Sequence, residues 1–205
     1  MKSEEGYLEQ RKMKKIAIFA SGTGSNALKI IEHFKDSDVA TVALVVSNKS
    51  KAAVLDKAKA NNIETLIIKR ATFYDTKEVL ELFKEKGIDF VVLAGFLWLM
   101  PRYFVKAYKE KMINIHPALL PKYGGKGMYG MNVHKAVHAA KEAITGITIH
   151  YVNEHYDEGS VVFQASCKVA KTDTPEDISM KVRALEHQYF PQIIEELIEE
   201  FERHS

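Results

Sequence analysis

From Lys14 onward, two sequence patterns alternate regularly, and this alternation constrains the fold of the chain more than any other feature. Short runs rich in β-branched residues alternate with longer segments whose apolar residues recur at helical spacing. The short runs are apolar on both faces, which is typical of parallel strands covered by helices on each side. We therefore predict an α/β fold with a doubly wound, mostly parallel, Rossmann-like sheet and helices on both of its faces.

The same patterns give the order of the predicted elements. Strands are predicted at residues 15–20, 42–47, 64–69, 90–95, 112–115, 144–152 and 160–169. Helices are predicted at residues 25–34, 52–62, 76–86, 101–109, 133–140 and from 174 to about 201. We expect the last two strands to pair through the turn at 155–160. Thr174, Pro175 and Asp177 are typical of a helix start, and Pro191 predicts a bend in that helix.

The length of 205 residues suits one domain. The sequence contains no internal repeat and no linker long enough to separate two domains, so we predict a single domain over residues 13–205. Residues 1–12 are rich in charge of both signs and lack the apolar region of a secretory signal. We predict that they form a flexible leader.

Composition excludes several classes of protein. A formal net charge of +2 is too balanced to favour nucleic acid as a partner. Cys167 is the only cysteine, which rules out an internal disulfide and favours a reducing compartment, so we predict a cytoplasmic location. The longest uncharged apolar stretch, residues 91–100, is about half of the roughly 20 residues that a membrane-spanning helix needs. We therefore expect no membrane-spanning segment.

The segment ASGTGSN, residues 20–26, falls between the first predicted strand and the first predicted helix. Its glycines let the backbone approach a ligand, and the amides of Gly24, Ser25 and Asn26 open a helix whose dipole favours a phosphate. The third glycine of a dinucleotide-binding motif is missing, so a single phosphate group is the better candidate ligand. The alternative is an ordinary strand-to-helix turn capped by Ser25.

The segment NIHPALLP, residues 114–121, places polar side chains at the end of a predicted strand. Asn114 and His116 are two residues apart on an extended chain, so both point to one side, at the edge where open α/β sheets bind ligands. An amide that donates to an oxyanion and an imidazole that moves a proton suit acyl transfer. The alternative is a polar strand end that is hydrogen-bonded to its own loop.

Asp157 lies in the predicted turn HYDEGS, residues 155–160. An aspartate in such a place is usually a turn residue. A neighbouring carboxylate would, however, raise the protonated fraction of an imidazole, and His116 would gain from such a partner. Asp157 is therefore a candidate third member of the site.

Four further residues have weaker patterns. His134 and His138 are four apart on one predicted helix face, which is the spacing of zinc ligands, but the segment lacks a glutamate base and a third ligand, so we predict no metal. Cys167 is expected to be a packed thiol rather than a nucleophile. His150 alternates with apolar residues and is either a core residue or a wall of the site.

Four segments, in their order along the chain, resemble the folate-dependent phosphoribosylglycinamide formyltransferases: ASGTGSN, NIHPALLPKYGG, GITIHYV and HYDEGSVVFQ. The resemblance runs from about Met13 to the carboxyl end. It is specific because the Asn-x-His-Pro segment and the later Asp-x-Gly turn recur together in few folds. Methionyl-tRNA formyltransferase and formyltetrahydrofolate hydrolase share the Asn, His and Asp residues, but both are longer.

The resemblance assigns Asn114, His116 and Asp157 to catalysis. It implies that the main chain of residues 24–26 holds the phosphate of a ribonucleotide. The residues implied to bind this substrate are Gly24, Ser25, Asn26, Arg183, which would lie near the phosphate, and Glu186, which would bind the ribose.

The resemblance also implies a folate site along an apolar strip and a later loop, with Lys77 as a basic residue near it. The other residues implied to contact the folate are Phe96, Leu97, Trp98, Leu99, Met100, Asn114, Val152, Asn153 and Tyr156. This chain departs from the family pattern in two places. Trp98 stands where members commonly have a basic residue, and the segment GGKGMYGMNVH makes the loop after NIHPALLPKY several residues longer than in many relatives.

The activity implied by the resemblance is transfer of a formyl group from 10-formyltetrahydrofolate to the amine of glycinamide ribonucleotide, in purine biosynthesis and without a metal. The two substrates are the implied partners, and the oligomeric state stays open between monomer and homodimer. One alternative is hydrolysis of the formyl folate. The other is a phosphate-binding regulator that catalyses no reaction.

Overall fold

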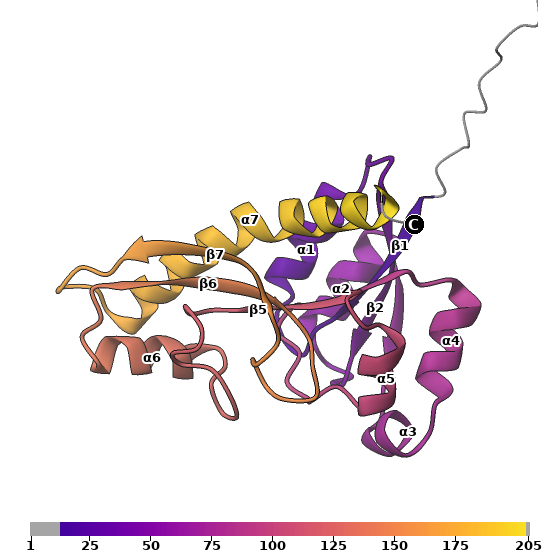
Figure 1. Cartoon of the computed structure of the whole chain (residues 1–205), viewed down its shortest axis with the longest axis horizontal. Helices are drawn as coiled ribbons and strands as arrows, with labels where there is room; N and C mark the ends of the chain where they lie inside the picture. Colours follow the sequence, from indigo (N-terminus) through magenta and orange to yellow (C-terminus); the bar gives the residue numbers. More distant parts are fainter. Residues whose placement is uncertain (1–12, 204–205) are drawn as a thin grey trace, which may run out of the picture.

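The computed structural model describes residues 13–203, so the predicted leader at residues 1–12 lies outside the described residues. The strands are β1 (Lys14–Phe19), β2 (Ala40–Ser47), β3 (Glu64–Ile67), β4 (Phe90–Leu93), β5 (Met112–His116), β6 (Ile144–Tyr151) and β7 (Val161–Lys168). The helices are α1 (Ser25–His33), α2 (Ala53–Ala60), α3 (Arg70–Asp75), α4 (Glu78–Lys86), α5 (Arg102–Ala107), α6 (Met131–Ala139) and α7 (Pro175–Arg203). The strands form one sheet (Figure 1).

The order of the strands in this sheet is β3-β2-β1-β4-β5-β6-β7. The pairs from β3 to β5 are parallel, whereas β6 pairs antiparallel with both β5 and β7. The predicted doubly wound, mostly parallel sheet is therefore confirmed. The chain moves outward from β1 to β3 and then returns to β4 on the other side of β1. This reversal leaves a crevice outside the carboxyl ends of β1 and β4, where open α/β sheets bind ligands.

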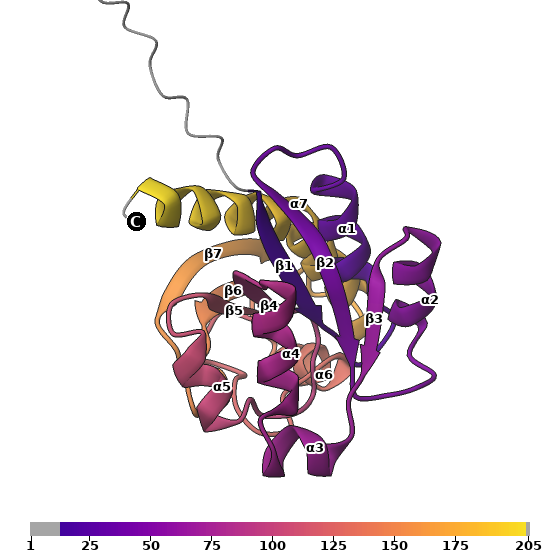
Figure 2. The ribbon, with the colours of Figure 1, turned by 90° about the vertical axis from the view of Figure 1, so that its right-hand side faces the viewer.

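Helices cover both faces of the sheet (Figure 2). One core lies under α1, α2, α6 and α7, and the other lies under α3, α4 and α5. Adjacent residues of β1 face opposite cores, because side chains alternate along a strand: Ile18 belongs to the first core and Phe19 to the second. Phe19 packs against Phe73, Phe83 and Phe104, with ring centroids 5.6–6.0 Å apart. Both faces of β1 are thus buried, as its apolar sequence predicts.

The last helix begins where the sequence predicts. Asp177 donates its backbone N–H to Thr174 Oγ1 at 3.2 Å, and Thr174 donates its own to Asp177 Oδ2 at 2.9 Å. This reciprocal cap satisfies two of the amides that a helix start leaves without partners. The helix continues to Arg203 with Pro191 inside it, and the bend near Pro191 stays a prediction.

Within the described chain, α3 is the helix that the sequence analysis missed. It has six residues and buries Phe73 alone, so no repeating apolar face marks it in the sequence. The bounds of the other elements differ from the predicted ones by only a few residues, as helix and strand ends commonly do.

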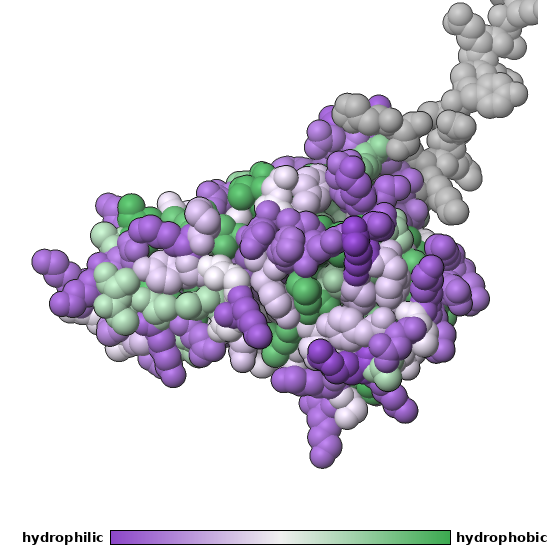
Figure 3. Space-filling model, turned by 60° about the horizontal axis from the view of Figure 1, so that its bottom comes forward, coloured by the Kyte–Doolittle hydropathy of each residue, from purple (hydrophilic) through white to green (hydrophobic). Residues whose placement is uncertain are grey.

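Figure 3 shows one face of the molecule, on which hydrophilic residues predominate and hydrophobic residues gather in small groups. Among residues 13–203, no helix combines the length and the apolar character needed to cross a membrane.

Candidate active site

A cavity of about 700 Å³ opens at the carboxyl ends of β1, β4 and β5. Its walls come from the β1–α1 turn, the β4–α5 loop, the end of β5, the glycine-rich loop before α6, the β6–β7 turn and α7. Nearly all of the residues that the sequence analysis assigned to a site line this one cavity. The exceptions are Lys77 and Asn153, which do not line it.

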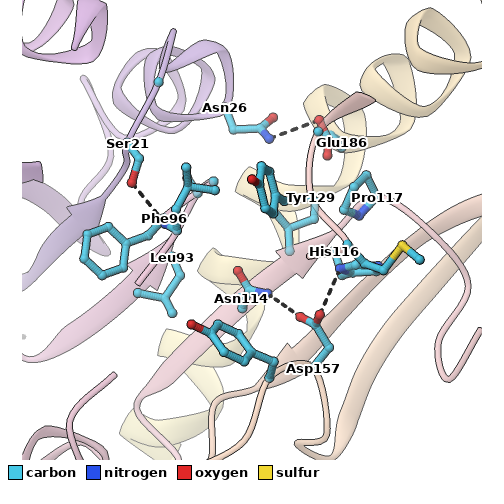
Figure 4. Close-up of a pocket in the computed structure, with 18 of the residues that line it drawn as sticks. Ser21, Asn26, Leu93, Phe96, Asn114, His116, Pro117, Tyr129, Asp157 and Glu186 are labelled. Carbon is cyan, nitrogen blue, oxygen red and sulfur yellow. Dashed lines mark hydrogen bonds and ion pairs between the residues drawn. The ribbon is translucent and has the colours of Figure 1, made fainter. Parts of the chain in front are cut away.

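The antiparallel pairing of β5 with β6 brings the three catalytic candidates together (Figure 4). Asn114 and His116 lie on the same side of β5, and the turn after β6 returns Asp157 to them. Asp157 has a φ of 57°, a left-handed conformation that aspartate tolerates better than most residues. Its Oδ2 lies 3.4 Å from His116 Nδ1, and its Oδ1 accepts a hydrogen bond of 3.4 Å from Asn114 Nδ2.

His116 is buried, with 3 % of its surface exposed. Its Nε2 lies 2.8 Å from the carbonyl oxygen of Tyr123, and a carbonyl can only accept, so Nε2 carries a hydrogen. The other nitrogen, Nδ1, faces the Asp157 carboxylate. A protonated imidazole would therefore find an acceptor at each nitrogen.

The Asp157 carboxylate is stabilised in its charged form. Burial alone would raise its pKa, but the contact with His116 and the N–H of Gly125, which lies 2.9 Å from Oδ2, outweigh burial and lower the pKa of Asp157 below its ordinary value. Asp157 is consequently a carboxylate at neutral pH, and its Oδ2 is an acceptor that faces His116 Nδ1.

His150 resolves the alternative that the sequence left open, because it is both buried and part of the cavity wall. Its backbone pairs with that of Asn114 across the two strands. Its Nε2 lies 3.1 Å from Asn114 Nδ2 and 3.5 Å from Asp157 Oδ1, and its Nδ1 lies 2.9 Å from the carbonyl oxygen of Tyr151.

The turn before α1 has the conformation that its glycines suggest. Gly24 occupies the N-cap position with a φ of 69°, and an added Cβ would overlap Val54 of α2. No side chain caps α1, so the alternative in which Ser25 is the cap is wrong. The backbone amides of the first turn are directed out of the helix start, where the helix dipole favours an anion.

Polar side chains from α1 and α7 face one another across this end of the cavity (Figure 4). Asn26 donates from Nδ2 to Glu186 Oε2 at 3.1 Å, which links two residues 160 positions apart. Burial raises the pKa of Glu186, although this hydrogen bond and the charge of Arg183 oppose the shift. Arg183 lines the cavity one turn earlier on α7 and supplies a positive charge there.

The apolar strip predicted at residues 96–100 forms another wall, together with Val152 and Tyr156. Trp98 packs edge-on against Phe96, and the Arg70 guanidinium lies 5.7 Å from the Trp98 ring centroid. Lys77 is exposed at the start of α4, and Asn153 lines a second cavity behind the β6–β7 turn. The structure therefore supports contact with the main cavity for the strip but not for Lys77 or Asn153.

His134 and Tyr129 are two of the cavity residues that the sequence analysis did not assign to the site. His134 lines the cavity, and burial, followed by the charges of Arg183 and His116, lowers the pKa of its imidazole. Tyr129 projects into the cavity from the glycine-rich loop (Figure 4). The spacing of His134 from His138 suggested only a metal site, and a loop without periodicity gives no signal for Tyr129.

The remaining chemistry-bearing residues do not join the cavity. His138 is exposed on α6, and no group of three His, Cys, Asp or Glu side chains within residues 13–203 is placed to hold a metal ion. Cys167 packs half-buried against the core under α7, and burial raises the pKa of its thiol, which makes it a weak nucleophile.

Residues 14–194 match the model of the formyl transferase family. The chain therefore belongs to this family, which confirms the resemblance seen in the sequence. Every residue that lines the main cavity lies within the matched part.

Among named proteins, the chain is 39% identical over 202 residues to the chloroplastic phosphoribosylglycinamide formyltransferase of Arabidopsis thaliana, and the match covers 96% of this chain and 69% of that protein. It is 36% identical over 192 residues to the trifunctional purine biosynthetic protein adenosine-3 of Bos taurus, covering 91% of this chain and 18% of that protein. The crystal structure of phosphoribosylglycinamide formyltransferase from Bacillus halodurans superposes with a TM-score of 0.81 at 36% identity, covering 90% of this chain and 95% of that one.

Proposed function

We propose that this formyl transferase moves the formyl group of 10-formyltetrahydrofolate to the amine of glycinamide ribonucleotide, as a step of purine biosynthesis. The observation that carries the proposal is that Asn114, His116 and Asp157 share one cavity with the glycine-containing turn at the start of α1 and an apolar strip. The names of the Arabidopsis and Bos taurus relatives support the same reaction.

Each substrate has a wall of suitable chemistry. A ribonucleotide phosphate suits the start of α1 at Gly24–Asn26, with Arg183 to balance its charge. Hydroxyl groups of a ribose suit the acceptors of Glu186. The flat, largely apolar folate suits the strip at residues 96–100, where aromatic and aliphatic side chains line the cavity.

The trio suits the addition step. The amine of the ribonucleotide forms a bond to the formyl carbon, and the carbonyl electron pair moves to the formyl oxygen. Asn114 Nδ2 and protonated His116 are the donors available to this oxyanion, because their contacts with Asp157 are long, at 3.4 Å each, and can be exchanged for the substrate. The Tyr123 carbonyl keeps the His116 ring in place from its other side.

The collapse step needs one proton at the departing folate nitrogen and releases one from the former amine. His116 is the group in the trio that can carry a proton, and the Asp157 carboxylate lies beside its Nδ1. The number of protons in the site is then unchanged after one turnover. Holding both substrates in one cavity makes the reaction effectively unimolecular.

The direct test mixes the protein with glycinamide ribonucleotide and 10-formyltetrahydrofolate and follows the deformylated folate by its absorbance. We expect release of that product only when the ribonucleotide is present, and loss of release in His116→Ala. His138→Ala is the matched control, because His138 is exposed on α6.

The same assay separates the alternatives. A hydrolase would release deformylated folate without the ribonucleotide. A binding protein without catalysis would release none, yet would bind the ribonucleotide in a titration. Either result would overturn the proposed transfer.

A further inference from the structure

The contacts of His150 define its tautomer. Nδ1 lies 2.9 Å from the carbonyl oxygen of Tyr151, which only accepts, so Nδ1 carries a hydrogen. Nε2 lies 3.1 Å from Asn114 Nδ2, which only donates, so Nε2 is the acceptor and carries none. Both contacts agree with one neutral form of the imidazole.

The local backbone allows this arrangement. The pairing of β6 with β7 shifts register between Ile149 and His150, and Tyr151 donates its N–H to the Ser160 carbonyl at 2.9 Å. Gly159 packs against the Tyr151 carbonyl, where a Cβ would overlap the oxygen and would lie 3.3 Å from His150 Nδ1. The turn therefore leaves room for the hydrogen bond between the Tyr151 carbonyl and the His150 ring.

The neutral His150 in turn orients the Asn114 carboxamide. Asn114 Nδ2 lies near both His150 and Asp157, and one of its N–H groups serves each of them. The carbonyl oxygen Oδ1 points away from Asp157 (Figure 4). The reverse orientation would set Oδ1 against the Asp157 carboxylate oxygen and would also require a charged His150. The carboxamide consequently has one favourable orientation.

We propose that His150 is a positioning residue for the transfer, because it holds Asn114 with an N–H and Oδ1 side by side at the reacting carbon. In the tetrahedral intermediate, the oxyanion and the former amine nitrogen are bonded to the same carbon. The N–H that Asn114 shares weakly with Asp157 donates to the oxyanion, while Oδ1 accepts an N–H of the amine. A single carboxamide then contacts both groups, and His150 prevents the half-turn of this carboxamide that would exchange its nitrogen and its oxygen. This inference rests on the proposed function.

Two substitutions separate positioning from packing. His150→Gln can keep an acceptor near the place of Nε2, whereas His150→Asn can keep a donor near Nδ1 but cannot reach Asn114. We expect His150→Asn to lower kcat by on the order of 10²-fold with both KM values nearly unchanged. We expect His150→Gln to recover most of that loss, and His138→Gln, on exposed α6, to match the parent protein. Equal losses in the two His150 variants, or a loss confined to KM, would overturn the proposal.

A second measurement does not depend on activity. Protein with ¹⁵N-labelled histidine is examined by NMR at pH 7.5, with the His150 signals assigned by their disappearance in His150→Gln. We expect a pyridine-type Nε2 and a protonated Nδ1. Protonation at Nε2 would overturn the proposal even if the enzyme is active. An inactive parent protein that showed the expected tautomer would instead count against the proposed function.

Discussion

The two binding walls of the cavity are built in opposite ways. The wall that we propose for the ribonucleotide consists of two helix segments, at the start of α1 and in α7, which are joined by a hydrogen bond between Asn26 and Glu186, 160 positions apart. The wall that we propose for the folate consists largely of one continuous stretch, residues 96–100, which follows β4 and packs on the core under α3, α4 and α5. The first depends on the tertiary arrangement of distant elements, and the second depends on local sequence.

Under the proposed function, this difference determines how each of the two substrates gains its affinity. Charge and backbone amides dominate the first wall, and such interactions are few and strong. Apolar contacts dominate the second wall, and these are many and individually weak. Substitutions at the catalytic centre and at each wall should therefore differ in size and in the kinetic constant that they change.

The largest effect is expected at the centre, between the two walls. His116→Ala removes the proton carrier, and we expect kcat to fall by about 10² to 10⁴. Both KM values should stay close to those of the parent protein, since neither wall is altered. Steady-state kinetics with each substrate varied in turn checks this. A large rise in only one KM would place His116 in that wall instead.

The next effect is expected at the ribonucleotide wall. Gly24→Ala forces a side chain into a left-handed conformation and against Val54, which displaces the turn before α1. Loss of charge-assisted hydrogen bonds to the phosphate should raise the KM for the ribonucleotide by roughly 10- to 100-fold. Titration of the folate by fluorescence should be unchanged.

Gly22→Ala is the matched control, because its Cβ would meet nothing within 4 Å. If Gly22→Ala and Gly24→Ala raised the KM for the ribonucleotide equally, displacement of the turn by the clash with Val54 would not be its cause.

A smaller effect is expected at the folate wall. Trp98→Ala removes an aromatic ring, and pairs of aromatic rings contribute about 0.5 to 1.5 kcal/mol, so we expect the KM for the folate to rise by only a few fold. Trp98→Phe should restore most of the affinity. Kinetics with the ribonucleotide varied should show no change, and an equal rise in both KM values would show that the walls are not independent.

The smallest effect concerns stability in acid and contrasts two carboxyl groups. The pKa of Asp157 is lowered on folding, so this residue stabilises the fold above pH about 4, and the contribution is lost as the pH falls towards the folded pKa. The pKa of Glu186 is raised, so its contribution is present below pH about 4 and is lost as the pH rises through the folded pKa.

Urea unfolding from pH 3 to 7 measures this contrast. The quantity compared is the increase in the free energy of unfolding between pH 3 and pH 7. Asp157→Asn should make this increase smaller and Glu186→Gln should make it larger, by on the order of 1 kcal/mol each. The same sign for both variants would contradict the two pKa directions.

The sequence predicted most of the fold because its strands are apolar on both faces and its helices have clear apolar stripes. It predicted that the Asn114 and His116 side chains share one side of the sheet at the end of a strand, because residues two apart on a strand project to the same side. Their contacts with Asp157 and His150 could not be derived in the same way, because they depend on the register of β5 with β6, which spacing within one strand does not determine.

Two residues show where the sequence gives no positional signal. Lys77 was carried over by resemblance alone; the structure places it on the exposed start of α4, away from the main cavity, and its role near the folate stays a prediction. Tyr129 was overlooked because it lies in a glycine-rich loop, where neither period of a strand or helix applies. The position of a loop residue depends on the contacts that hold the loop. Here these are the hydrogen bond between His116 and the Tyr123 carbonyl and the hydrogen bond from the Gly125 N–H to Asp157.

The direct pairing of Asn114 with His150 has a consequence for how the gene can change. Side chains alternate along a strand, so insertion or deletion of one residue in β6 would replace His150 at the cavity by Ile149 or Tyr151 and turn the imidazole to the opposite face. Such changes should be eliminated by selection, whereas the number of residues between the loop contacts and α6 can drift. Length variation in this lineage should therefore collect at residues 126–130 and spare the strand.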